Sequence, residues 1–326
     1  MADLSVDLCS RLISSGLDPA AVVRVIQAGL AEDLADGPDV TTGATIPPGS
    51  LGTADVVARN PGVIAGLSVA EAVFQLVGAG DGSAESVQRP AAPIARSGLP
   101  SDPSQVFPVT SVYNITDGAI VDAGTTLMTV EGPLTAILTA ERTALNLITP
   151  LSGIATLTRQ WVDAVAGTKA RIRDTRKTLP GLRMLEKYAV RCGGGVNHRM
   201  SLSDAALIKD NHVAAAGSVT AALDAVGKAA PDLPVEVECD TLEQVDEAIA
   251  AGAGLILLDN FSVPEMRAAV ELNAGRAWLE ASGGLRLEDA AAVAATGVDF
   301  LAVGALTHSA AVLDIGLDLV RAGWVR

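Results

Sequence analysis

The second half of the chain alternates short apolar runs with alanine-rich stretches of helical character. The last four apolar runs begin 20 to 23 residues apart and are rich in Val, Ile and Leu. Regular alternation of this kind predicts βαβ units that build a parallel sheet. Six strands are expected, at Ala170–Asp174, Ala206–Lys209, Val235–Glu238, Leu255–Asp259, Trp278–Ala281 and Phe300–Val303.

The first half has a different pattern, with longer helical segments and fewer strands. Residues 78–107 hold 4 Gly, 4 Pro and 5 Ser and are expected to form a surface loop. The other predicted segments are helices over 6–33 with a break at Gly16–Pro19, short β-like structure over 39–67, strands over 110–115 and 125–130, and a helix over 134–158 kinked at Pro150.

Polar, reactive residues follow almost every predicted strand of the second half. A barrel builds its active site at this face from several strand ends, whereas a doubly wound sheet concentrates its site at one switch point. The pattern therefore favours a barrel. The polar clusters begin at Asp174, Lys209, Glu238, Asp259, Ser282 and Gly304.

Composition and charge narrow the class of protein. The chain has 326 residues, 49% of them hydrophobic and 19% charged, which is enough apolar material for two packed domains. The net charge of −15 repels phosphate backbones and anionic lipid, and only 3% of the residues are aromatic. Neither a general nucleic-acid binder nor a membrane-surface protein is expected.

The cysteines and the N-terminus bear on the compartment. Cys9, Cys192 and Cys239 are far apart and form no CxxC pair, and the N-terminus lacks the basic start of a signal peptide. The longest uncharged run, Thr143–Thr158, is too short and too polar to cross a bilayer. We expect a cytoplasmic protein with reduced thiols.

Positive charge is concentrated between Lys169 and Lys209, where 10 basic residues occur with only 3 acidic ones. A solvated helix face is the interpretation for three of them, Arg183, Lys187 and Arg191, on a helix expected to start at Pro180. The others lie at strand ends or in loops, where guanidinium and ammonium groups suit an anionic ligand. These are chiefly Arg173, Arg176, Lys177, Arg199 and Lys209.

Three further features leave a structural and a functional interpretation open. The glycine run in Cys192–Arg199 is either a helix end and turn or a device that delivers His198 and Arg199 side by side. The strand-end carboxylates either pair with the cations or coordinate Mg²⁺ or ribose hydroxyls. The turns at 282–284 and 304–305 are either simple turns or a phosphate cradle. The carboxylates are Glu236, Glu238, Asp259 and Glu280.

From the residues alone, the chain is expected to be a barrel enzyme for a small anionic substrate that carries a phosphate. The same residues resemble the quinolinate phosphoribosyltransferase family. The central block consists of RDTRKTLPGLR at 173–183, LEKYAVRCGGGVNHR at 185–199 and LIKDNH at 207–212. Shorter matches at 32–34, 39–42, 141–146, 151–156 and 280–284 extend the resemblance over nearly the whole chain. Residues 80–105 are longer than the family pattern.

The resemblance implies a fold and a reaction. The implied fold is α/β: an incomplete parallel α/β barrel over 141–305 and an N-terminal α/β-sandwich domain over 1–140, joined by the C-terminal segment 306–326. The implied reaction converts quinolinate and 5-phosphoribosyl 1-diphosphate to nicotinate mononucleotide, diphosphate and CO₂ in de novo NAD synthesis. Mg²⁺ is the implied cofactor, and a homodimer or larger assembly is implied.

Motif positions carry the family's site onto this chain. Lys177, Lys209, Glu238 and Asp259 are implied as catalytic, with Lys177 between both substrates and the two carboxylates serving ribose and Mg²⁺, directly or through water. The implied quinolinate ligands are Arg142 (reaching into the neighbouring subunit's site), Arg176, His198, Arg199 and Lys209, with Thr175 as a further substrate contact. The implied 5-phosphate ligands are Ser282, Gly283, Gly284, Gly304 and Ala305.

Three other functions remain as alternatives. A metal-transport-linked paralogue would share the barrel motifs but lack the full set of carboxylate-binding arginines that this chain has. A Schiff-base aldolase would use the strand-end Lys209 as its nucleophile. A non-catalytic phospholigand-binding protein would bind without turnover.

Overall fold

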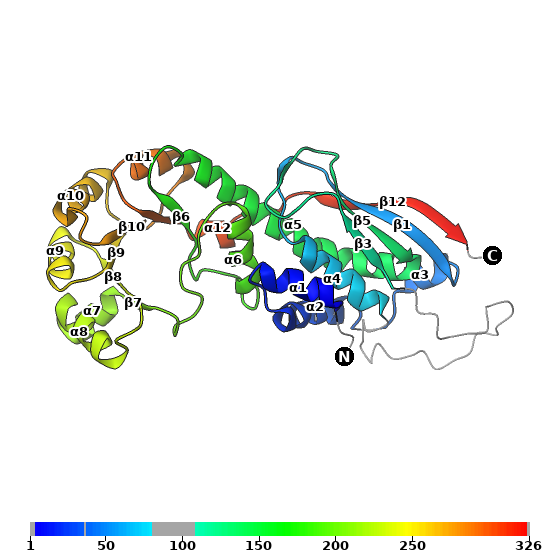
Figure 1. Cartoon of the computed structure of the whole chain (residues 1–326), viewed down its shortest axis with the longest axis horizontal. Helices are drawn as coiled ribbons and strands as arrows, with labels where there is room; N and C mark the ends of the chain where they lie inside the picture. Colours follow the sequence, from blue (N-terminus) through cyan, green and yellow to red (C-terminus); the bar gives the residue numbers. More distant parts are fainter. Residues whose placement is uncertain (1–3, 36, 80–107, 325–326) are drawn as a thin grey trace. The chain divides into compact units, whose positions relative to one another are not determined.

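Two compact units make up the chain. A computed structural model describes residues 4–35, 37–79 and 108–324 (Figure 1). The first unit comprises Met1–Thr156 and Ala311–Arg326, and the second comprises Leu157–Ala310. The contacts thus divide the chain after Thr156 and after Ala310. The family resemblance instead implies domain boundaries at 140 and 305. The predicted loop at 78–107 lies, from residue 80 onward, outside the described residues.

The first unit begins with the two predicted helices. Helix α1 spans Val6–Ser14 and α2 spans Pro19–Asp33, with the break between them where it is predicted. Asp18 ends the break, because its side chain accepts a hydrogen bond from the Ala20 N–H at 3.0 Å and Pro19 opens the first turn.

The β-like prediction for 39–67 is wrong at its start. Val40–Thr45 forms a short helix, α3, because the Asp39 side chain caps the Thr42 N–H at 2.9 Å. Strands β1 (Ser50–Ala58) and β2 (Gly62–Val63) follow as expected. Helix α4 then covers Leu67–Gly78 and is buried along most of its length.

An antiparallel sheet forms the other layer of the first unit, and α4 packs on its strands β3 and β5. The strand order is β12-β1-β5-β3, and a separate ribbon pairs β2 with β4. The C-terminal strand β12 runs along β1 from Ser50↔Trp324 to Ala58↔Ile315, so the C-terminal segment joins this unit. The remaining strands are β3 (Thr110–Tyr113), β4 (Ile120–Val121), β5 (Thr126–Pro133) and β12 (Ile315–Trp324).

A 31-residue helix, α5, spans Leu134–Ala164 and runs from the first unit into the second. Pro150 lies inside it, as predicted, and the helix continues six residues past the predicted end. None of the helices in the described ranges is long and apolar enough to cross a membrane.

The second unit is an incomplete parallel barrel. All six predicted strands are present, in the order β6-β11-β10-β9-β8-β7, and every adjacent pair is parallel. Strands β6 and β7 are the two open edges of the sheet, which is why the barrel is incomplete. The strands are β6 (Arg171–Arg173), β7 (Ala206–Ile208), β8 (Val235–Cys239), β9 (Leu255–Asp259), β10 (Trp278–Ser282) and β11 (Phe300–Ala302).

Helices cover the outer side of this curved sheet (Figure 1). Several are fixed at their starts by side-chain caps; Thr241 and Gln244 form a capping box, as do Ser262 and Glu265. The helices are α6 (Arg183–Cys192), α7 (Asp210–Ala216), α8 (Val219–Ala229), α9 (Leu242–Ala250), α10 (Val263–Asn273), the 3₁₀ turn η1 (Leu287–Asp289), α11 (Ala290–Ala294) and α12 (Ala305–His308).

Candidate active site

A cavity of about 400 Å³ opens at the carboxyl ends of the barrel strands. Most of the residues singled out in the sequence line it, so the strand-end clusters do converge. Its charged and polar lining consists of Thr175, Arg176, Lys177, His198, Arg199, Lys209, Glu238, Asp259, Glu280 and Ser282; Leu207, Leu257 and Ala302 complete it.

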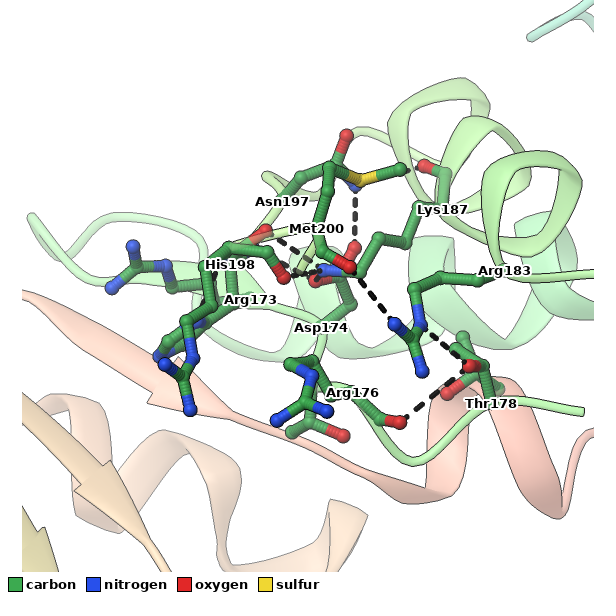
Figure 2. Close-up of polar contacts among 12 residues, drawn as sticks. Arg173, Asp174, Arg176, Thr178, Arg183, Lys187, Asn197, His198 and Met200 are labelled. Atoms are coloured by element: carbon green, nitrogen blue, oxygen red, sulfur yellow. Dashed lines mark hydrogen bonds and ion pairs between the residues drawn. The ribbon is translucent and has the colours of Figure 1, made fainter. Parts of the chain in front are cut away.

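A buried ion pair anchors the end of β6 beside this cavity (Figure 2). The Lys187 Nζ, with no exposed surface, lies 2.5 Å from the Asp174 carboxylate and donates to the carbonyl oxygens of His198 at 2.8 Å and Arg199 at 3.0 Å. Asp174 also accepts from the His198 N–H and the Asn197 amide. Burial raises the pKa of Asp174 and lowers the pKa of Lys187, and their mutual attraction opposes both shifts.

The expectation that Lys187 belongs to a solvated helix face is therefore wrong. Lys187 lies on the inner side of α6, where one of its hydrogen bonds goes to the Asp174 carboxylate and the other two hold the backbone carbonyls of His198 and Arg199. Arg183 is also engaged, because it donates to Thr178 Oγ1 and to the Met200 carbonyl (Figure 2). Both side chains thus shape the loops around the cavity.

The glycine run lets the loop after α6 pass close to the helix. Gly194 has φ +92°, a conformation that side chains disfavour. A Cβ on Gly195 would lie 2.7 Å from Val190 Cγ1 and 3.2 Å from the Val190 carbonyl oxygen. The run is thus both a helix end and the connection that brings His198 and Arg199 to the cavity.

His198 is held through both ring nitrogens. Its Nδ1 accepts a hydrogen bond from the Arg199 N–H at 2.7 Å, so a neutral ring carries its proton on Nε2. That Nε2 lies 2.7 Å from a Glu236 oxygen and 3.7 Å from Glu280 Oε1. Glu280 in turn pairs with Arg173 at 2.6 Å.

Two neighbouring guanidinium groups have unpaired buried atoms. The Nε atoms of Arg176 and Arg199 are buried without a hydrogen-bond partner among the described residues. Burial and the adjacent charge of Arg176 lower the pKa of Arg199, which otherwise donates to the Ala205 carbonyl at 2.9 Å. Two adjacent half-exposed guanidinium groups with unpaired Nε atoms suit an anionic ligand in this part of the cavity.

Carboxylates on β8 and β9 occupy the other part of the cavity. Glu238 pairs with Lys209, and Asp259 accepts from the Asn260 amide at 2.7 Å. Their oxygens are hard donors that fit Mg²⁺. A second set, His198 with Glu236 and Glu280, also places its donor atoms within 4.8 Å of one another. A metal ion at either set would compete with a cation that already pairs there, Lys209 at Glu238 and Arg173 at Glu280.

The glycine turns after β10 and β11 adjoin the cavity, but of the predicted phosphate residues only Ser282 is among its lining. Gly283 has φ +94°, and a Cβ there would lie 2.6 Å from the Asn260 backbone nitrogen. A Cβ on Gly304 would lie 2.9 Å from Lys177 Cδ. Close packing therefore accounts for both glycines. Gly284 and Ala305 lie in the same two turns.

Models of two family domains match the chain. The quinolinate phosphoribosyl transferase N-terminal domain matches residues 39–152, and the C-terminal domain of the same family matches residues 154–318. The chain belongs to the quinolinate phosphoribosyl transferase family. The incomplete barrel and the antiparallel first unit are the fold that this membership implies.

Relatives of known name support the same family assignment. The chain is 54% identical over 297 residues to the carboxylating nicotinate-nucleotide pyrophosphorylase of Mycobacterium leprae, covering 90% of this chain and 95% of the relative. A probable enzyme of the same name from Synechocystis is 42% identical, with coverages of 91% and 92%. The crystal structure of NadC from Streptococcus pyogenes superposes with a TM-score of 0.81 at 34% identity, covering 95% of this chain and all of that one.

The contribution of Arg142 to the active site of a neighbouring subunit stays a prediction. Arg142 is exposed and lies on α5 in the first unit, whereas the whole lining of the cavity comes from the second unit. The sequence left Glu236 and Glu280 open between pairing with cations and coordinating Mg²⁺ or ribose hydroxyls; in the structure Glu280 pairs with Arg173, and Glu236 lies beside His198. Their burial beside His198 depends on how three separate segments meet, which the sequence pattern does not show.

Proposed function

We propose that this chain transfers the phosphoribosyl group of 5-phosphoribosyl 1-diphosphate to quinolinate and releases nicotinate mononucleotide, diphosphate and CO₂, as a cytoplasmic enzyme of de novo NAD synthesis. The observation that carries this proposal is the pair of cavity-lining guanidinium groups of Arg176 and Arg199, whose buried Nε atoms have no hydrogen-bond partner among the described residues. Two adjacent carboxylates on a small ring are the anion that satisfies such a pair best.

The two halves of the cavity then have separate tasks. Arg176 and Arg199 bind the pyridine dicarboxylate, with Lys209 at the same opening. Glu238 and Asp259 offset the positive charge that develops on the ribose when diphosphate departs. Lys177, which lines the same cavity, neutralises the leaving group in this proposal. The turns that contain Ser282 to Gly284 and Gly304–Ala305 serve the 5-phosphate through backbone N–H groups.

The role proposed for His198 is narrower than the sequence implies. Its Nδ1 accepts a backbone N–H, and its Nε2 faces Glu236. The ring therefore forms a wall of the quinolinate pocket and keeps the neighbouring backbone in place. Thr175 fixes the adjacent turn, because its Oγ1 accepts from the Lys177 N–H at 3.0 Å.

Mg²⁺ is part of the proposal, with Glu238 and Asp259 as its protein ligands. When bound, the ion neutralises charge on the diphosphate group. Ribosylation makes the pyridine ring cationic, and that charge favours loss of the adjacent carboxylate as CO₂. The protein's own residues mainly bind and orient the two substrates, which is a large part of catalysis in itself.

The proposed assembly is a homodimer or larger oligomer in which Arg142 completes the site of the neighbouring subunit. The charge of −15 argues against nucleic acid as a partner.

The direct test is to mix the protein with quinolinate, phosphoribosyl diphosphate and Mg²⁺ and to measure CO₂ and nicotinate mononucleotide. Both products are expected, and EDTA should abolish them. Glu238→Gln and Asp259→Asn should each lower turnover by about 10²–10³-fold with the fold retained. Binding of both substrates without turnover would leave a binding protein, and full activity in EDTA would remove Mg²⁺ from the proposal.

A further inference from the structure

Lys177 is an exposed lysine that lines the cavity, and its ammonium group forms no ion pair with any carboxylate that the structure describes. A lysine side chain is a point charge on a long, flexible stem. Without a partner, the direction of the ammonium group depends on how firmly the backbone and the stem are held. The function proposed above needs this direction to be fixed, because the ammonium group neutralises the departing diphosphate.

Helix α12 and the turn before it hold both parts of Lys177. The Thr307 hydroxyl of α12 donates to the Lys177 carbonyl oxygen at 2.7 Å, although the two residues are 130 positions apart in the chain. Thr307 is buried, so water does not compete for this bond. The stem of Lys177 packs against Gly304, where an added Cβ would lie 2.9 Å from Lys177 Cδ.

The bond from Thr307 to Lys177 is not the one that a helical threonine ordinarily makes. Such a hydroxyl usually bonds a carbonyl three or four residues earlier in its own helix. The Gly304 carbonyl is that local acceptor here, but it lies at 3.3 Å, whereas the Lys177 carbonyl lies at 2.7 Å. The shorter bond therefore joins α12 to the loop after β6.

Other side chains hold the far end of the same loop to α6. The Glu186 carboxylate accepts a hydrogen bond from the Leu179 N–H at 3.1 Å, and Arg183 Nε donates to Thr178 Oγ1 at 3.0 Å (Figure 2). These bonds remain when the Thr307 hydroxyl is removed. Its loss should therefore loosen Lys177 without unfolding the loop.

We propose that Thr307 is a positioning residue for Lys177, a proposal that rests on the function proposed above. Its hydroxyl fixes the backbone from which the ammonium group reaches the diphosphate of phosphoribosyl diphosphate. The same helix follows the turn at Gly304–Ala305, which serves the 5-phosphate in the proposed function. The Thr307 bond thus sets the separation between the groups that bind the two charged ends of this substrate.

Thr307→Val tests the proposal, because it replaces the hydroxyl with a methyl group of similar size, and Thr307→Ser restores the hydroxyl. Steady-state kinetics give kcat/KM for phosphoribosyl diphosphate and KM for quinolinate. In Thr307→Val we expect kcat/KM for phosphoribosyl diphosphate to fall by about tenfold, while KM for quinolinate changes by less than about twofold. Thr307→Ser should recover most of the loss.

A double variant shows whether Thr307 acts through Lys177. Lys177→Met removes the ammonium group and should lower kcat/KM for phosphoribosyl diphosphate by about 10²-fold. If the hydroxyl acts by directing that ammonium group, adding Thr307→Val to Lys177→Met should cause little further loss. A loss by the same factor with and without the ammonium group would overturn the proposal.

Thr296→Val is the matched control. The Thr296 hydroxyl is also buried and donates to a backbone carbonyl, that of Val293, at 2.6 Å. Thr296 precedes the amino end of β11 and does not line the cavity, which lies at the carboxyl ends of the strands. This variant should lose stability to a similar extent as Thr307→Val but keep both kinetic constants.

Three results in Thr307 variants would overturn the proposal: an unchanged kcat/KM in Thr307→Val, a KM for quinolinate that rises as much as kcat/KM falls, or a Thr307→Ser protein as impaired as Thr307→Val. If Thr307→Val does not fold, Thr307→Ala gives the same comparison, and a tenfold loss in Thr307→Ser alone would still contradict the role of the hydroxyl. Failure of the wild type to form nicotinate mononucleotide would instead overturn the proposed function, so the two failures are distinguishable.

Discussion

At the residue scale, the cations near the barrel cavity fall into two groups. Lys187 is fully buried and each of its donors has an acceptor within the chain. Arg176 and Arg199 are half-exposed and keep buried Nε atoms without a partner among the described residues. The fully paired, buried cation has a structural role, whereas the two incompletely paired cations line the place where an anionic ligand binds.

Lys187→Met is therefore expected to destabilise the fold strongly. The change leaves Asp174 buried without its cation, which costs on the order of 3–5 kcal/mol in the free energy of unfolding. Lys187→Met combined with Asp174→Asn should recover part of the loss. The matched control is Arg159→Met, which removes the exposed Arg159–Asp163 pair of α5 and should cost about 1 kcal/mol or less.

Urea unfolding of the four proteins measures these differences. A Lys187→Met loss no larger than the Arg159→Met loss would contradict the role given to the buried pair.

The role of Lys187 could not be predicted from the sequence. Lys187 and Asp174 lie 13 residues apart in different elements, and neither helical nor strand periodicity relates two such positions. Arg176 and Arg199 could be found, because strand ends and a glycine run are local signals. The local pattern therefore finds where charge gathers but does not show which charges are paired inside the fold.

At the element scale, regular spacing made the barrel predictable. The six strands lie where the regular spacing of apolar runs places them, and no boundary differs by more than one residue. The segment 40–45 was predicted wrongly because a single cap, Asp39, decides its conformation, and apolar spacing does not report on caps. The edge strand β12 of the first sheet pairs with β1, which lies more than 250 residues earlier in the chain. Only the family resemblance indicated that the C-terminal segment joins the first unit.

The loop after α6 gives a prediction at this scale. Gly195→Ala should displace the loop, because the new Cβ would contact Val190 and the Thr158 methyl group at 2.7–2.9 Å. We expect the KM for quinolinate to rise by about tenfold or more, since His198 and Arg199 follow directly, and the KM for phosphoribosyl diphosphate to change less. The measurement is steady-state kinetics with each substrate varied in turn.

Gly227→Ala is the matched control for this prediction. Gly227 lies in helix α8 with nothing within 4 Å of an added Cβ, so the change should leave both KM values alone and stabilise the helix by about 0.4–1 kcal/mol. Equal KM shifts for the two substrates in Gly195→Ala would argue against a loop dedicated to the pyridine.

At the scale of the whole molecule, the cavity belongs to one unit and Arg142 to the other. The proposed shared site predicts complementation between subunits. Arg142→Ala and Lys209→Ala should each be nearly inactive as homodimers. After subunit exchange at equal amounts, about a quarter of the wild-type activity should return, because half of the dimers are mixed and one of their two sites is intact.

Activity that stays absent although mixed dimers are shown to form would place Arg142 in the site of its own chain. The exchange can be verified with a mass tag on one of the two variants.

The two neighbouring guanidinium groups of Arg176 and Arg199 are proposed to select a pyridine that carries two carboxylates. Nicotinate carries one carboxylate where quinolinate carries two, so binding nicotinate leaves at least one guanidinium group covered by the ring but without an anionic partner, at a cost of about 3–5 kcal/mol. The decisive measurement is kcat/KM for both pyridines with the wild type and Arg176→Ala. We predict a wild-type preference for quinolinate of several hundred- to several thousand-fold, reduced sharply in the variant. Comparable wild-type values for quinolinate and nicotinate would contradict the account.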